Sequence, residues 1–257
     1  MPERSKTQRR GQAILNLALS GNVLNVDLLA QDLGVSRETV RRDLARLDRA
    51  GLLRRVHGGA VAVRLGLVVE EDAFDARMRQ AVAAKRAIAA HVAAELRCGQ
   101  SLFIDTGSTT VFLAEALVAC KQLTIITNSA RIASLAAKGE GARIVLLGGE
   151  FRSAGAETVG AATLAQIAQL RADHAILTVA SVTAAGCYDI DPAEADIARA
   201  MISRAGQVTI LADASKFDRG GVSEVCTMAQ VTRLVTDYIP PAIAAAARAA
   251  GVLVHQV

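Results

Sequence analysis

The sequence predicts an α/β protein with a small N-terminal helical domain and a larger, mostly parallel α/β domain. From about residue 81, helical stretches alternate with short apolar runs, a pattern typical of a parallel sheet that helices cover on both faces. The 257-residue chain is 52% hydrophobic, which allows a sizeable core and suits two domains. Residues 1–64 hold twelve Arg or Lys against six Asp or Glu, whereas the remainder is slightly acidic. This asymmetry indicates that only the first part meets a polyanion.

The first 63 residues predict three short helices and a two-stranded wing. Apolar side chains recur at helical spacing over Thr7–Leu19, Val26–Leu33 and a stretch that Ser36 caps and that runs to Ala50. Leu52–Val56 and Ala60–Val63 predict two strands around a glycine turn. The third helix carries arginine on the side that its apolar residues leave exposed. We interpret residues 1–63 as a winged helix-turn-helix domain.

In such a domain, the start of the recognition helix enters the major groove of double-stranded DNA and the wing contacts the DNA backbone. Arginine at these positions can grip guanine or a phosphate. The candidate DNA-binding residues are Arg37, Thr39, Arg41, Arg42, Arg54, Arg55 and His57. Charge alone also fits a solvated helix face that is rich in arginine.

Residues 64–80 are expected to form a mixed-charge, partly helical connector, and residues 81–257 the α/β domain. Its predicted strands are Ser101–Asp105, Leu123–Thr127, Arg143–Leu147, Ala175–Ala180, Val208–Ala212 and Leu234–Thr236. Helices fit near 81–97, 109–119, 129–138, 161–170, 192–204 and 241–250. In an open α/β sheet, ligands bind beyond the carboxyl ends of the strands.

One turn stands out at such a strand end. After Asp105, Gly107 permits close backbone approach, and Ser108, Thr109 and Thr110 open a helix. Backbone N–H groups, hydroxyls and the positive helix end would converge there on an oxyanion such as a phosphate. The turn matches neither of the nucleotide-binding glycine motifs, and we expect no cofactor. Taken alone, the turn also fits an ordinary helix cap.

Other features limit the class of protein. Cys98, Cys120, Cys187 and Cys226 have no zinc-finger spacing and are expected to be buried or free thiols in a reducing compartment, so no metal site is predicted. The polar, basic N-terminus does not resemble a signal peptide, and no apolar run is long enough to span a membrane. We therefore expect a cytoplasmic protein with no membrane partner.

The segment from Val35 to Leu44, together with the wing from Gly51 to Ala60, resembles the N-terminal domain of DeoR-family repressors. The helix sequence Thr-Val-Arg-Arg-Asp-Leu and the wing sequence Arg-Val-His-Gly-Gly-Ala are specific in combination. The resemblance continues through the sensor domain of that family, at Asp105–Thr110, Thr127–Ser129, Leu147–Glu150, Thr158–Gly160, Asp189–Met201 and Ala212–Phe217.

This resemblance implies a sensor fold similar to sugar-phosphate isomerases and a phosphorylated sugar or polyol as effector. It also implies release of an operator by that effector and self-association, as a homodimer or homotetramer. Carried over position by position, it indicates an effector site formed by Asp105, Thr106, Gly107, Ser108, Thr109, Thr110, Asn128, Ser129, Glu150 and Lys216.

One stretch departs from the family pattern, because Ala180–Gly186 lacks an early glycine after its strand, which leaves the shape of that pocket wall open. The acidic run from Asp189 to Glu194 could face polyol hydroxyls, although the first turn of the next helix is the favoured interpretation.

We expect a repressor of a carbohydrate or polyol catabolic operon rather than an enzyme. A sugar-phosphate isomerase with a DNA-binding appendage is one alternative, because Asp105, Glu150, Asp189, Asp191 and Lys216 supply suitable acid, base and oxyanion groups. An architectural DNA-binding protein without a ligand is another, in which case the polar strand ends have no binding role.

Overall fold

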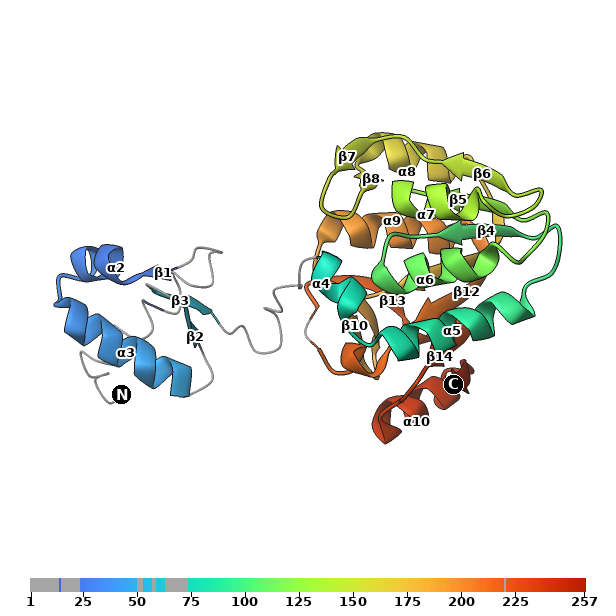
Figure 1. The fold of residues 1–257 in the computed structure, drawn as a ribbon. Coiled ribbons are helices and arrows are strands. Elements are labelled where there is room, and N and C mark those ends of the chain that lie inside the picture. Colours follow the sequence, from blue (N-terminus) through green and yellow to red (C-terminus); the bar gives the residue numbers. More distant parts are fainter. Residues whose placement is uncertain (1–13, 15–23, 50–52, 57–58, 63–73, 220) are drawn as a thin grey trace. The chain divides into compact units, whose positions relative to one another are not determined.

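The structure is a computed structural model that describes residue 14 and residues 24–49, 53–56, 59–62, 74–219 and 221–257. The chain divides into two compact units, Met1–Val68 and Val69–Val257. Figure 1 shows the elements of each unit along the chain. No described helix is long and apolar enough to cross a membrane.

The N-terminal unit contains the two described helices and the wing that the sequence predicts. Helices α2 (Val26–Asp32) and α3 (Arg37–Arg49) are joined by a tight turn in which Gly34 has φ 61°. Ser36 caps α3, because its Oγ accepts a hydrogen bond from the backbone N–H of Thr39 over 3.2 Å. The buried core of the N-terminal unit consists of Ile14, Leu29, Val40, Leu44 and Leu47.

The wing is a three-stranded antiparallel sheet in the order β1-β3-β2 (Leu24–Asn25, Gly59–Ala62, Leu53–Val56). The sequence predicts the two longer strands but not β1, which is only two residues long. Most of the first predicted helix, Thr7–Leu19, lies outside the described residues, although Ile14 is helical and buried.

The second unit is built on a seven-stranded sheet in the order β15-β14-β12-β9-β4-β5-β6, and every neighbouring pair is parallel. Six of these strands were predicted. The strands are β4 (Ser101–Ile104), β5 (Thr124–Thr127), β6 (Arg143–Leu146), β9 (Ala172–Thr178), β12 (Ala205–Leu211), β14 (Arg233–Thr236) and β15 (Leu253–Gln256).

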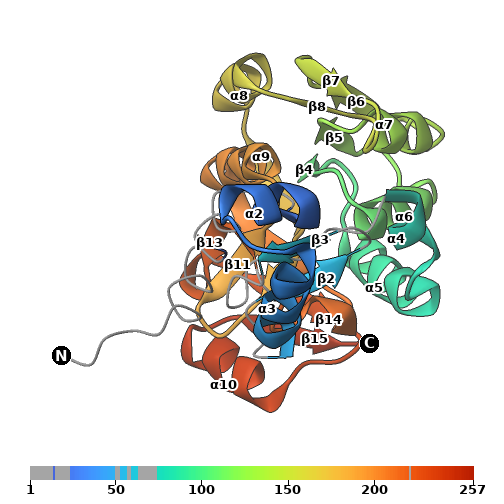
Figure 2. The same cartoon turned by 90° about the vertical axis from the view of Figure 1, so that its left-hand side faces the viewer.

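Helices cover both faces of this sheet, as the fully apolar strands predict (Figure 2). In β4, Leu102 and Ile104 pack into one core cluster while Phe103 packs into the other. Helices α5 (Val82–Glu95), α6 (Ser108–Leu117) and α7 (Ala130–Ala136) contribute to the first cluster. The second cluster includes residues of α8 (Ala161–Ala168), α9 (Pro192–Ser203) and α10 (Pro241–Ala249).

Short antiparallel strands that the sequence does not predict follow several strands of the main sheet. Strands β7 (Glu150–Arg152) and β8 (Glu157–Val159) form a hairpin after β6. Strands β10 (Ser181–Val182), β11 (Gly186–Asp189) and β13 (Ser223–Thr227) form a separate sheet after β9 and β12. Two 3₁₀ turns, η1 (Ala214–Lys216) and η2 (Met228–Gln230), complete these connections.

The expected connector contains the short helix α4 (Phe74–Arg79). Phe74 is buried in the same core cluster as Phe112 of α6, so α4 belongs to the second compact unit. Residues 63–73 lie outside the described part of the chain.

Candidate functional site

The exposed side of α3 brings three of the predicted DNA-binding residues together. Arg37, Arg41 and Arg42 are exposed within the first two turns, whereas Val40 and Leu44 anchor the opposite side in the core. The guanidinium of Arg42 pairs with the Glu38 carboxylate over 3.6 Å, at the i, i+4 spacing of a helix surface. The result is a positively charged helix start of the kind that enters a DNA groove.

The remaining predicted DNA contacts are less completely described. The hydroxyls of Thr39 and Ser36 lie 2.9 Å apart, so Thr39 takes part in the helix cap. Arg54 and Arg55 occupy β2, opposite Val61 and Ala60 of β3, but their side chains lie outside the described part of the structure. His57 lies outside the described residues.

In the second unit, the topology itself marks a candidate ligand site. The chain builds β4, β5 and β6 outward in one direction and then continues from β9 through β12 and β14 to β15 in the other. Strands β4 and β9 are therefore the neighbours from which the two halves diverge. Open α/β sheets bind ligands beyond the carboxyl ends of the strands at such a switch point.

Asp105, the residue that follows β4, holds this switch point together. Both of its carboxylate oxygens lie 3.1 Å from the backbone N–H of Thr178, the last residue of β9. Burial raises the pKa of Asp105 well above its ordinary value, the Thr178 N–H group opposes that rise, and the nearby Asp189 carboxylate adds to it. Burial therefore makes ionisation of the Asp105 carboxyl group less favourable than in water.

The turn after Asp105 leads directly into α6, and its glycine is required by a close approach. A Cβ on Gly107 would lie 2.0 Å from the Thr178 hydroxyl oxygen. Gly107 is also the N-cap residue of α6 and has no side chain to cap the first turn. The first N–H groups of a helix have no partner within it, so this end of α6 offers donors and a positive dipole to an anion.

The hydroxyls of this turn are more enclosed than the sequence suggests. Ser108, Thr109 and Thr110 are buried, with 5%, 2% and 0% of their surface exposed. The Thr110 hydroxyl lies 3.0 Å from the carbonyl oxygens of both Asp105 and Gly107, so it braces the turn. The predicted oxyanion site therefore depends on the backbone of the turn more than on its Thr110 hydroxyl.

A narrow cavity lies beside the turn, with about 10 Å³ available to the centre of a water-sized sphere, which is room for about one water. Its lining consists of Asp105, Thr106, Asn128, Asp189, Glu194 and Ile197. The Asn128 amide donates to the carbonyl of Thr158 over 3.0 Å, while its buried Oδ1 has no hydrogen-bond partner among the described residues. This oxygen can accept a hydrogen bond from a ligand hydroxyl.

Carboxyl groups surround this cavity more densely than the sequence predicts. Glu157 of β8 is 3% exposed, and burial raises its pKa while hydrogen bonding to Glu194 lowers it. Arg152 of β7 forms an ion pair with Asp191, and Asp191 also caps α9 by accepting from the Ala193 N–H over 2.8 Å. The favoured interpretation, the first turn of the next helix, is therefore confirmed for Asp191 and Glu194. Asp189 and Glu194 also line the cavity.

The other predicted effector residues occupy different positions. The Ser129 hydroxyl caps α7, because it accepts from the Ile132 N–H over 3.4 Å. Glu150 is exposed at the start of β7 and is not part of the cavity lining. Lys216, at the end of η1, is half-buried and lies within electrostatic range of Lys85.

Lys85 of α5 is a buried cation that the sequence analysis did not single out. It is 2% exposed, and its Nζ donates to the carbonyl of Arg77 in α4 over 2.6 Å. Burial lowers its pKa, the Asp213 carboxylate opposes this, and Lys216 reinforces it. Lys85 thereby links α4 to the segment that follows β12. Its position within an alanine-rich helix gives no signal of this role.

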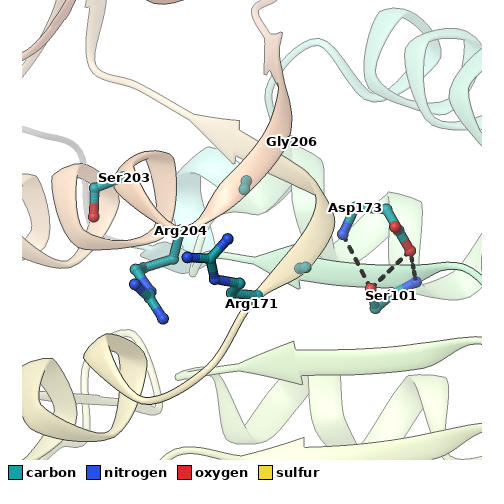
Figure 3. A pocket seen from close by; sticks show the side chains of 8 residues that line it. Ser101, Arg171, Asp173, Ser203, Arg204 and Gly206 are labelled. Atoms are coloured by element: carbon teal, nitrogen blue, oxygen red, sulfur yellow. Dashed lines mark hydrogen bonds between the residues drawn. The ribbon is translucent and has the colours of Figure 1, made fainter.

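A larger cavity of about 370 Å³ lies at the amino ends of β4, β9 and β12 (Figure 3). Arg171 and Arg204 line it, and Ser101 and Asp173 hydrogen-bond across one side of it. It contains none of the predicted site residues and lies at the end of the sheet opposite to the switch point.

Comparison with known proteins covers both units. The DeoR-like helix-turn-helix domain matches residues 10–64, and the DeoR C terminal sensor domain matches residues 80–238. The chain is 34% identical to the HTH-type transcriptional repressor CsqR of Escherichia coli (strain K12) over 94% of this chain and 92% of that protein. It is 35% identical to the glycerol-3-phosphate regulon repressor of Haemophilus influenzae, over 93% and 92% of the two chains.

Among solved structures, ribose 5-phosphate isomerase A from Methanocaldococcus jannaschii matches with a TM-score of 0.37 and 16% identity, over 52% of this chain and 53% of that one. The curated relatives are named as transcriptional regulators, which supports the expectation of a regulator rather than an enzyme. Two family models that together match most of the sequence, and relatives above 30% identity over nine-tenths of it, show that the chain belongs to the DeoR family of transcriptional repressors.

Proposed function

We propose that this protein represses a carbohydrate or polyol catabolic operon and that a phosphorylated sugar or polyol releases it from the operator. The observation that carries the effector half is the start of α6, where an uncapped helix N-terminus opens beside a polar cavity at the switch point of the sheet. The glycerol-3-phosphate regulon repressors among its relatives are consistent with an effector of this class.

In this proposal, the two parts of the effector meet different chemistry. The phosphoryl group binds the backbone of the turn Asp105–Thr110, with Lys216 as the cation of that region. The polyol hydroxyls face Asn128, Asp189 and Glu194, because carboxylates accept hydrogen bonds from hydroxyls but repel a phosphate. Ser129 is assigned to this site only as the cap of α7, and Glu150 only as an exposed residue outside the cavity lining. The cavity holds about one water, so an effector requires the surrounding elements to separate.

DNA binding is assigned to residues 1–63, with α3 in the major groove. Arg37, Thr39, Arg41 and Arg42 would face the base edges and nearby phosphates. Arg54, Arg55 and His57 of the wing would contact the DNA backbone. Paired half-sites suit a homodimer or homotetramer, because linking two DNA-binding domains raises their effective concentration.

Signal transfer in this scheme passes through residues 64–80. An effector changes DNA affinity only if it binds one arrangement of the protein better than another. The Lys85 hydrogen bond to Arg77 ties α4, at the end of that connector, to α5 and to the charges of Asp213 and Lys216. Movement of the segment after β12 on effector binding would therefore reach α4.

The test is a fluorescence-anisotropy titration of full-length protein against DNA from upstream of its own operon. We expect sequence-specific binding at moderate salt that weakens when glycerol 3-phosphate or another phosphorylated sugar or polyol from a panel is added. Absence of a specific complex would contradict the DNA assignment. A specific complex that every phosphorylated compound leaves unchanged would contradict the effector assignment.

A further inference from the structure

A second cluster of polar side chains lies away from the effector cavity, where α5 packs beside the edge of the sheet. His91 and Glu95 occupy the last turns of α5 at i and i+4, so they share one face of the helix. His255 belongs to the edge strand β15 and lies 164 positions after His91 in the chain. Arg233, the first residue of β14, forms an ion pair with Glu95, whereas His255 is level with Val235, the third residue of β14.

The distances within this cluster are those of a metal site. Nε2 of His91 lies 3.2 Å from Nδ1 of His255 and 3.4 Å from Oε1 of Glu95. One ligand atom from each of the three residues lies within 4.8 Å of the others. Zinc bonds of about 2.0–2.1 Å at tetrahedral angles separate neighbouring ligand atoms by roughly 3.3 Å. The ion would therefore fit with only small side-chain adjustments.

We propose that His91, Glu95 and His255 bind a divalent zinc ion. Two imidazoles and one carboxylate are a ligand set that zinc accepts, with a fourth position left for water or another donor. His91 and Glu95 keep about a third of their side-chain surface exposed, so solvent can reach that fourth position. Mg²⁺ prefers oxygen ligands and is expected to bind poorly.

A neighbouring side chain, Arg233, orients one of the three proposed ligands, Glu95. Arg233 holds Oε2 of Glu95 and leaves Oε1 directed at His91. Its own guanidinium is steadied by the Thr209 hydroxyl at 3.3 Å and 3.4 Å. Partners of this kind fix a ligand before the ion arrives, and their loss typically weakens metal affinity about 10- to 100-fold. The sequence predicted no metal site from the spacing of its cysteines, and His91 and Glu95 gave no signal of one because the third ligand, His255, is distant in the chain.

The competing interpretation is a hydrogen-bonded histidine pair without a metal. In that case one ring nitrogen donates to the other, and zinc has no affinity above that of scattered surface groups. The two interpretations differ in what the protein does when zinc is offered, so direct binding separates them.

The experiment titrates Zn²⁺ into full-length, chelator-treated protein without a polyhistidine tag, against a chromophoric competitor. A Cys98→Ser background removes the one exposed cysteine among the described residues. We expect one zinc per chain in the micromolar range or tighter and no comparable binding of Mg²⁺. His91→Ala and His255→Ala should each weaken binding at least about 10-fold, because a lost ligand costs no less than a lost supporting residue.

His174→Gln is the control, because His174 is a buried histidine that lies outside the cluster, and its replacement should leave zinc affinity unchanged. Should an alanine variant fail to fold, Co²⁺ bound to the otherwise unaltered protein gives an independent reading. Visible bands of a low-symmetry nitrogen and oxygen site support the proposal, and a thiolate charge-transfer band would assign the metal to a cysteine and overturn it. Wild-type protein that takes up no zinc, or variants that bind it equally well, would also overturn it.

Discussion

The carboxylate of Asp105 bridges to the backbone N–H of Thr178, with 3.1 Å to each oxygen. This contact joins the carboxyl ends of β4 and β9, the two strands between which the sheet changes direction. The carboxyl group is nevertheless buried, and burial raises its pKa well above the ordinary value. Asp105 therefore connects the two strands at the candidate site, although burial makes ionisation of its carboxyl group unfavourable.

Asp105→Asn should make the stability of the protein less dependent on pH. Because the folded-state pKa of Asp105 is raised, the folded state holds this proton more tightly than the unfolded state. Its contribution is fully present below the unfolded-state pKa and is lost as the pH rises through the folded-state pKa. Urea unfolding between acidic and neutral pH should therefore show that the variant gains stability relative to wild type as the pH rises.

Asp173→Asn supplies a control of opposite sign. Hydrogen bonds from Ser101, first from its backbone N–H group, lower the pKa of Asp173. Its contribution is present above the unfolded-state pKa and is lost as the pH falls through the folded-state value. This variant should lose stability relative to wild type toward neutral pH. Parallel pH profiles for the two variants would contradict the assignment at Asp105.

The sequence predicts the main sheet well because its inner strands are short apolar runs, as at Phe103 and Ile176, and such runs are diagnostic of a parallel sheet. Edge strand β15 has only two apolar residues, Leu253 and Val254, followed by two polar ones, and all four residues are at least partly exposed, so it lacks that signal. Strands β10 and β11 are short and pair with each other in a local hairpin, and β11 also pairs with the distant strand β13. Pairing of that kind leaves little trace in local sequence.

The sequence likewise predicts some residues of the candidate site and misses others. Asp105 and Gly107 stand out because one turn joins a strand to a helix. Glu157 and Lys85 do not, since a hairpin glutamate and a lysine in an alanine-rich helix usually face solvent. Their burial, at 3% and 2% exposed, depends on elements that come together only in the folded chain.

Gly107→Ala should destabilise the protein by about 1–3 kcal/mol, the usual cost of overpacking. The new Cβ would lie 2.0 Å from the Thr178 hydroxyl oxygen and 3.1 Å from its Cβ, and the extended backbone at Gly107 adds no strain. Effector affinity should fall as well, because the turn must shift. Thermal unfolding and effector titration measure the two effects.

Thr178→Ala removes the clashing hydroxyl and should restore most of the stability of the Gly107→Ala variant. Such recovery in a double-mutant cycle would locate the effect at this contact. Gly148→Ala is the matched glycine control, since its Cβ would meet only the Gln166 side chain at 3.5 Å. If the double variant is no more stable than Gly107→Ala alone, the close approach is not the cause.

Lys85→Met should uncouple effector binding from DNA release. Methionine keeps the length of the buried chain but cannot donate to the Arg77 carbonyl or face Asp213 with a charge. Residues of this kind change coupling by about 0.5–2 kcal/mol, or roughly 2- to 30-fold in the effect of effector on DNA affinity. Anisotropy titrations with and without a saturating effector measure that ratio.

The matched control is Lys138→Met, which makes the same substitution at an exposed lysine. It should leave the ratio unchanged. The pKa of Lys85 is lowered by burial, so wild-type stability should rise with alkaline pH as this amine loses its proton, and Lys85→Met should lack that rise. A variant with normal coupling would remove Lys85 from the signalling path, even if its alkaline profile had changed.

Arg41→Ala should weaken operator binding by about 1–3 kcal/mol if this side chain reads a base. Arg41 is exposed near the start of α3, and its helical neighbour Arg42 is already engaged with Glu38. Loss of a base contact relaxes the sequence preference at one base pair. Loss of a phosphate contact instead weakens binding to all sequences alike and lowers the slope of log affinity against log salt concentration by about one. Arg97→Ala in the sensor domain is the control, because it changes the net charge of the protein by the same amount. Equal binding by the Arg41 and Arg97 variants would remove Arg41 from the residues that contact DNA.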